Sequence, residues 1–171
     1  MKIFINAGHG GADSGAVSKK GLKEKEINRI VSSFLAGLLI EDGYNIEFYQ
    51  QEKSVNQVVE AEKKSGASLV ISIHCNSSTN PLAKGVEVLH YPNSGTGKRV
   101  AELVCEEITK DLEITNRGAK ARNDLRILSG TNAPAVLVEL AFLSNPDEEK
   151  LLEKEFYLFA NAIAKGIKKW Q

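Results

Sequence analysis

The sequence predicts a three-layer α/β domain, in which a twisted and mostly parallel sheet is flanked by helices. Short runs rich in β-branched and aromatic residues alternate with longer stretches of helical spacing, mostly in the order strand, helix, strand, helix. Two of the runs, Leu69–Ile73 and Ala135–Val138, are apolar on both faces. This composition is typical of strands that helices cover on both sides.

The strands and the first helix are the clearest elements of the predicted architecture. Five runs are predicted to be strands: Lys2–Asn6, Asn45–Tyr49, Ser68–His74, Gly85–Tyr91 and Ala135–Leu140. A long helix is predicted from Glu24 to Ile40, ending near Gly43. Apolar residues at i, i+3, i+4 and i+7 form one stripe along it: Ile27, Ile30, Val31, Phe34, Leu35, Leu38 and Leu39. We expect this stripe to pack on the sheet.

Three further helices are predicted by the same spacing. One begins at Val55 behind Ser54, a suitable N-cap residue. The other two are marked by their apolar positions, which are Val100, Leu103, Val104 and Ile108 in one and Leu152, Phe156, Phe159, Ala160, Ile163, Ala164 and Ile167 in the last. Each helix therefore has one apolar face to bury.

Composition limits the classes of partner. The 171 residues are 42% hydrophobic and 26% charged, and no repeat or linker divides them, which predicts a single domain over residues 1–171. The 22 basic and 22 acidic side chains cancel, so the chain has no long-range attraction to nucleic acid or to an anionic membrane. We expect no nucleic-acid partner and no membrane partner, and we expect a monomer.

The sequence also lacks targeting and redox signals. The apolar run in Met1–Asn6 is too short for the core of a signal peptide, and no run approaches the roughly 18 apolar residues that span a bilayer. Cys75 and Cys105 form no CxxC pair, and we interpret both as small core residues. We therefore expect no export signal in these residues.

Candidate functional residues lie where the predicted strands end. In open α/β sheets, ligands bind outside the carboxyl ends of the strands. The first strand runs into the glycine-rich segment around His9, the third ends at His74, and the strand Ala135–Val138 runs into Glu139. Two histidines and a carboxylate can therefore converge. Two imidazoles need at least one more protein ligand to hold a catalytic zinc ion.

Helical phase favours one of two glutamates as the third ligand. Glu24 and Glu26 both lie at the start of the first predicted helix. At about 100° per residue, Glu24 falls within the apolar stripe and Glu26 falls outside it. A carboxylate inside an apolar stripe is costly unless it is paired or bound to a metal. We therefore expect Glu24 to point toward the sheet and Glu26 toward solvent.

Four motifs follow one another along the chain: NAGHGGADSG from Asn6, GLKEKEIN from Gly21, ISIHCN from Ile71 and PAVLVELAFLSN from Pro134. Together they resemble those of the zinc-dependent N-acetylmuramoyl-L-alanine amidases, which cut peptidoglycan between the lactyl group of muramic acid and the first alanine of the stem peptide. The resemblance covers nearly the whole chain. It departs at Asn6-Ala7, where the family usually has Asp-Pro, and at Glu26, where Asp is more common.

The resemblance implies one zinc ion per chain, with His9, Glu24 and His74 as its ligands and Glu139 as the catalytic glutamate. Zinc bound in this way lowers the pKa of water to about 7 and polarises the scissile carbonyl. Glu139 would accept the water's proton and pass it to the departing alanine nitrogen. The resemblance also implies peptidoglycan as substrate and the bacterial cell wall, extracellular or periplasmic, as the place of action.

Other interpretations stay open at this point. Taken alone, Glu139 is better explained by an ion pair with a residue such as Arg126 than by a catalytic role. His90 also ends a predicted strand, although no motif surrounds it. A non-catalytic peptidoglycan-binding domain of the same fold is the alternative function. A zinc peptidase acting on the stem peptide is a further one, but its close His-x-x-Glu ligand pair is missing.

Overall fold

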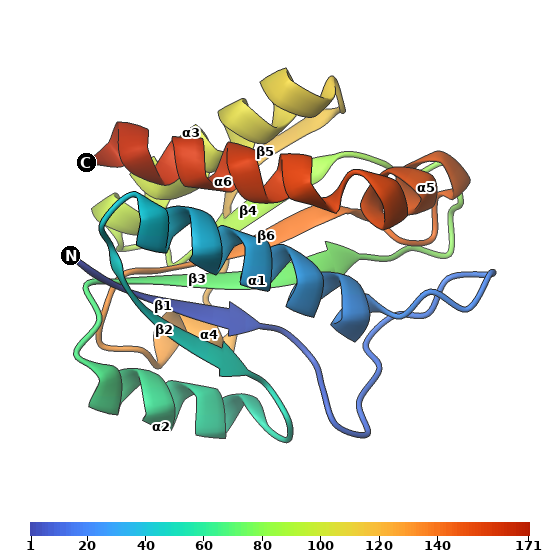
Figure 1. The fold of residues 1–171 in the computed structure, drawn as a ribbon. Coiled ribbons are helices and arrows are strands. Elements are labelled where there is room, and N and C mark those ends of the chain that lie inside the picture. Colours follow the sequence, from blue (N-terminus) through green and yellow to red (C-terminus); the bar gives the residue numbers. More distant parts are fainter.

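The computed structural model describes residues 1–171 and contains one six-stranded sheet (Figure 1). The strands are β1 (Lys2–Ala7), β2 (Asn45–Gln50), β3 (Leu69–Asn76), β4 (Val86–His90), β5 (Asn116–Ala121) and β6 (Ala135–Phe142). They lie in the order β2-β1-β3-β6-β4-β5. The first four of these are mutually parallel, β4 is antiparallel to β6, and β5 is parallel to β4. The predicted α/β class and mostly parallel sheet are confirmed.

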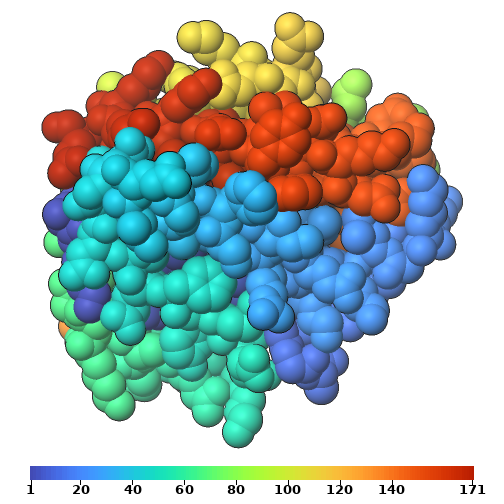
Figure 2. Space-filling model, in the orientation of Figure 1, coloured from blue at the N-terminus to red at the C-terminus, as the bar shows by residue number.

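Helices cover both faces of the sheet. They are α1 (Glu24–Glu41), α2 (Val55–Ser65), α3 (Gly95–Leu112), α4 (Arg126–Ser129), α5 (Pro146–Lys154) and α6 (Phe156–Trp170). A cluster of 30 buried residues joins one face to α1, α3, α5 and α6, and a cluster of 10 joins the other face to α2 and α4. Figure 2 shows the surface of α1 beside that of α6. None of the helices is long and apolar enough to cross a membrane.

The structure corrects the prediction for three elements. The four-residue helix α4 was not predicted. Strand β5 was not predicted, because its sequence NRGAKA has no apolar alternation, which an edge strand does not need. The single last helix is in fact two helices, since the chain breaks at Glu155 between α5 and α6. Helix α5 has a start of its own at Pro146, where the Asn145 side chain accepts hydrogen bonds from the backbone N–H groups of Asp147 and Glu148.

The apolar stripe of α1 is narrower than predicted. Ile27, Val31, Leu35 and Leu39 are buried, but Ile30 and Phe34 are 40% and 49% exposed. The Phe34 ring lies edge-on to Phe156 of α6, with 5.1 Å between the ring centroids. Phe34 therefore packs along the junction of two helices rather than on the sheet. At the start of α2, Ser54 occupies the N-cap position, although its side chain makes no capping hydrogen bond.

The direction of β4 separates His90 from the other two histidines. His90 is the last residue of β4, but β4 runs against β6, so His90 lies opposite Val136 near the start of β6. It is buried, and its Nδ1 lies 2.9 Å from the backbone oxygen of Tyr91. The carboxyl ends of the four parallel strands lie at the opposite end of the sheet from His90, together with the segments that follow β1 and β3 (Figure 1).

Candidate metal centre

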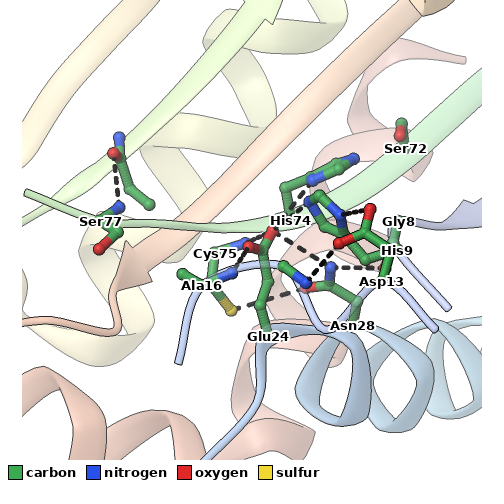
Figure 3. A network of polar contacts seen from close by, with 12 residues as sticks. Gly8, His9, Asp13, Ala16, Glu24, Asn28, Ser72, His74, Cys75 and Ser77 are labelled. Atoms are coloured by element: carbon green, nitrogen blue, oxygen red, sulfur yellow. Dashed lines mark hydrogen bonds and ion pairs between the residues drawn. The ribbon is translucent and has the colours of Figure 1, made fainter. Parts of the chain in front are cut away.

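Three side chains converge at the carboxyl ends of β1 and β3. His9 follows β1, His74 lies near the end of β3, and Glu24 is the first residue of α1. One ligand atom from each lies within 4.8 Å of the other two. The Glu24 Oε1 atom is 3.3 Å from His9 Nε2 and 3.0 Å from His74 Nδ1. Figure 3 shows the three side chains pointing toward one another.

Glycine allows this close approach. A Cβ atom on Gly8 would lie 2.2 Å from His74 Nε2, so any side chain there would displace the imidazole. His9 itself has a φ of 59°, in the left-handed region that is unusual for a residue with a side chain. This backbone turn carries the His9 ring away from the direction of β1 and toward Glu24.

Two neighbours that the sequence reasoning did not identify hold the ligand-bearing groups in place (Figure 3). Asp13 Oδ2 lies 2.8 Å from His9 Nδ1, which leaves Nε2 directed toward Glu24. The buried Asn28 donates hydrogen bonds to the backbone oxygen of Gly8 and, at 3.4 Å, to Glu24 Oε1. A carboxylate on the far nitrogen of a ligating histidine typically fixes its tautomer and orientation. Asn28 is four residues after Glu24, so helical spacing could have indicated it.

The charges of the cluster depend on one another. Burial alone would raise the pKa of Glu24, but hydrogen bonds with His74 and His9 lower that pKa well below its ordinary value. The hydrogen bond to Glu24 raises the pKa of His9 to about 9, against the effect of burial. Backbone N–H groups of Ala16 and Cys75 also donate to the Glu24 carboxylate. An ionised glutamate therefore lies at the centre of the cluster.

The two N-terminal glutamates of α1 point as helical phase predicted. Glu24 is 4% exposed. The Glu26 side chain is 51% exposed, and its only ion pair is a 3.8 Å contact with Lys23. The burial of Glu24 is balanced by its hydrogen bonds, as a buried carboxylate requires. The orientation of both side chains is thus confirmed.

Glu139 lies beside this cluster, on β6. It is the register partner of His74 on β3, so both side chains stand on the same face of the sheet. Its Oε2 atom is buried and has no hydrogen-bond partner. Burial raises the pKa of Glu139 to about 7. The alternative partner Arg126 contacts Asn56 instead, through Nε. Glu139 is therefore a carboxyl group without an ion-pair partner, and it can gain and lose a proton near neutral pH.

Both cysteines are buried, as predicted. Cys75 follows His74 but packs in the larger core cluster, with its Sγ 3.6 Å from Asn28 Oδ1. Burial raises the pKa of its thiol. A buried, protonated thiol is a poor metal ligand. The donor atoms offered at this site are therefore nitrogen and oxygen.

Two imidazoles and one carboxylate, with a further glutamate alongside, are the donor set of zinc hydrolases. Comparison with known proteins narrows this class. Residues 3–169 match the family model described as N-acetylmuramoyl-L-alanine amidase, and the chain belongs to that family of enzymes. The family that the four sequence motifs indicated is therefore confirmed.

Relatives and solved structures agree with this assignment. The germination-specific N-acetylmuramoyl-L-alanine amidase of Bacillus subtilis is 32% identical over 96% of this chain and 77% of its own length. The endolysin of Bacillus phage SPP1 is 33% identical over 96% of this chain and 62% of its own length. The structure of the CwlD amidase from Clostridioides difficile in complex with the GerS lipoprotein superposes with a TM-score of 0.89, at 31% identity, covering 99% of this chain and 97% of that one.

Proposed function

We propose that this chain, acting as one catalytic domain over residues 1–171, hydrolyses the amide bond between N-acetylmuramic acid and L-alanine in peptidoglycan, with one zinc ion held by His9, Glu24 and His74. The observation that carries the proposal is the convergence of these three donors beside the unpartnered carboxyl of Glu139. The place of action is the bacterial cell wall, because peptidoglycan lies there.

The donor set fits a zinc ion. Zinc accepts histidine nitrogen and glutamate oxygen, and catalytic sites use three protein ligands so that one position stays open. The three donors here are already gathered, and an ionised Glu24 supplies the negative charge. When bound, zinc supplies a Lewis acid that polarises the scissile carbonyl and makes a nucleophile available at neutral pH.

The chain's own residues supply binding and proton transfer. The side chains of His9 and His74 are 25% and 16% exposed, so the site lies at the surface, where a polymeric substrate can reach it. Glu139, with a pKa of about 7, accepts a proton from the attacking water and delivers it to the alanine nitrogen as the C–N bond breaks. Without that proton the amine is a poor leaving group.

Digestion of purified sacculi by the zinc-loaded protein tests the proposal. Mass analysis of the soluble products is expected to find intact stem peptides with a free L-alanine amino group, and glycan strands whose muramic acid carries no peptide. Products cleaved within the stem peptide would instead indicate a peptidase. Binding to sacculi without release of any product would indicate the non-catalytic wall-binding domain.

The variant Glu139→Gln separates binding from chemistry. It keeps the size of the side chain and removes the base, so we expect zinc content and melting temperature close to those of the wild type and turnover lower by about 10²–10⁴-fold. Glu26→Gln is the matched control, because it neutralises an exposed glutamate outside the cluster. Near-native turnover by Glu139→Gln would assign Glu139 a structural role, and loss of zinc would make it a ligand.

A further inference from the structure

A row of charged and polar side chains continues from the candidate metal centre across the sheet. His74 on β3 is paired with Glu139 on β6, and Glu139 is paired with Glu87 on β4. Residues directly opposite each other on neighbouring strands have their side chains on the same face. The next strand, β5, brings Arg117 and Lys120 to Glu87. We name these five residues the polar row.

Glu87 anchors the two cations at the end of the polar row. It is 9% exposed, and its Oε2 atom accepts a hydrogen bond from Arg117 Nε at 2.8 Å and one from Lys120 Nζ at 2.5 Å. Its Oε1 atom accepts a bond from Asn76 Nδ2 at 3.1 Å. The Arg117 guanidinium also lies over the ring of Phe142, 4.9 Å from its centroid. Both cations are therefore held in fixed positions.

The cations have binding capacity left over. One carboxylate partners two positive charges, so this end of the row carries one uncompensated positive charge. The side chains of Arg117 and Lys120 are 34% and 42% exposed, and only one N–H of each is used by Glu87. A guanidinium with its remaining N–H groups free offers a planar set of donors that suits a carboxylate. Because Glu87 already orders both side chains, binding an anion costs little further conformational entropy.

Spacing indicates which substrate group can reach the cations. Neighbouring strands are about 4.8 Å apart, so Glu87 lies one strand from Glu139, and the cations contact Glu87 from the strand beyond. An extended peptide advances about 3.4 Å per residue. In the proposed reaction the alanine nitrogen lies at Glu139, and the three metal donors lie on the side of Glu139 away from β4. A stem peptide that continues along the polar row from that nitrogen presents its next one or two residues to Arg117 and Lys120.

On these grounds, and resting on the proposed function, we infer that Arg117 and Lys120 bind a free carboxylate of the stem peptide one or two residues beyond the scissile bond. In peptidoglycan the second stem residue is a glutamate joined to the next residue through its side chain, so its α-carboxyl group is either a free carboxylate or an amide. The subsite therefore selects the carboxylate form over the amidated form.

The experiment compares two substrates with the zinc-loaded enzyme: soluble glycan strands whose stem peptides carry the α-carboxylate, and otherwise identical strands that carry the α-carboxamide. We expect the wild type to favour the carboxylate strands by about tenfold in kcat/KM, with the difference mainly in KM. Arg117→Ala and Lys120→Ala are each expected to lose more on the carboxylate strands than on the amide strands, so that the preference falls toward one.

Two further variants serve as controls for the carboxylate subsite. Arg99→Ala, on α3 against the other face of the sheet, removes an exposed arginine with only a 4.0 Å contact to Glu102, and is expected to keep the full preference. Arg117→Lys keeps the charge without the planar donors and is expected to keep part of the preference even if Arg117→Ala is poorly folded.

The outcomes separate this inference from the proposed function. Equal use of both substrates by the wild type, or equal losses on both in Arg117→Ala and Lys120→Ala, would overturn the carboxylate subsite while leaving the amidase activity in place. Failure of the wild type to release stem peptides from either substrate would overturn the proposed function, and the subsite with it.

Discussion

Glu24 is the residue on which most of the candidate centre depends. It meets both histidines, accepts two backbone N–H groups and is contacted by Asn28. Its position follows from helical phase, which is visible in the sequence. The residues that orient the site, Asp13 and Asn28, were not predicted. The i,i+4 spacing of Asn28 from Glu24 on α1 could have indicated Asn28. The role of Asp13 depends on how the loop after β1 folds, and no periodicity records that.

Substitution at the start of α1 tests the assignment of the third ligand. Glu24→Ala is expected to lower zinc affinity by more than the roughly 10–100-fold typical of losing an outer hydrogen-bond partner, and to abolish most activity. Glu26→Ala is expected to change neither, because its side chain is exposed. Competition with a chromogenic chelator measures both affinities. Equal losses in the two variants would remove Glu24 from the ligand set.

Zinc affinity is expected to depend on pH through His9. A ligating imidazole must be neutral, and the pKa of His9 in the metal-free protein is raised to about 9. Zinc must therefore displace a proton at any pH below about 9, so affinity rises by about tenfold per pH unit from pH 7 and levels off near pH 9. Calorimetry in buffers of different ionisation enthalpy measures the released proton. A flat profile between pH 7 and pH 9 would contradict this.

At the level of elements, most of the predictions that succeeded had a strong hydrophobic period. Strands β1, β3 and β6 and helix α1 were predicted close to their observed bounds, because each buries a continuous apolar set. Strand β5 was missed because its sequence NRGAKA has no apolar alternation and its Arg117 and Lys120 side chains pair with Glu87 rather than join the core. The other edge strand, β2, has β-branched and aromatic residues and was predicted. The prediction that Phe34 packs on the sheet was wrong, because the contact of Phe34 with Phe156 of α6 is a tertiary feature that the spacing within α1 does not record.

The contact between α3 and α6 depends on one glycine. A Cβ atom on Gly166 would lie 2.8 Å from Val104 Cα, so Gly166→Ala forces the two helices apart and is expected to lower the free energy of unfolding by about 1–3 kcal/mol. Gly37→Ala is the matched control on α1, where a Cβ meets nothing within 4 Å. It is expected to raise the free energy of unfolding by about 0.5–1 kcal/mol. Urea denaturation of both variants checks the opposite signs.

At the level of the whole molecule, the hydrophobic core does not include the candidate metal centre. The 30-residue and 10-residue clusters hold the helices on the sheet without His9, Glu24 or His74. The fold class was therefore predictable from apolar patterning alone. The antiparallel direction of β4 was not predicted, because the direction of a strand depends on the path of the chain around it.

Removal of zinc is accordingly expected to abolish activity and leave the fold intact. Chelation should leave the far-ultraviolet circular dichroism spectrum unchanged. The free energy of unfolding should fall only by the contribution of zinc binding, about 2.7 kcal/mol when zinc is present at a hundred times its Kd. Loss of the helical spectrum on chelation would show that the metal is structural, and the return of activity on adding zinc back is the control.

Strand order also bears on the synthesis of the chain. Strand β6, at residues 135–142, is the last strand to be made, yet it lies in the middle of the sheet, between β3 and β4. Until β6 has left the ribosome, no strand joins β2, β1 and β3 to β4 and β5 by hydrogen bonds, and Glu139 is not yet in place. A nascent or truncated chain that ends before β6 therefore has neither a continuous sheet nor Glu139, the proposed proton carrier. The joining of the two parts of the sheet and the proposed proton transfer depend on the same eight residues.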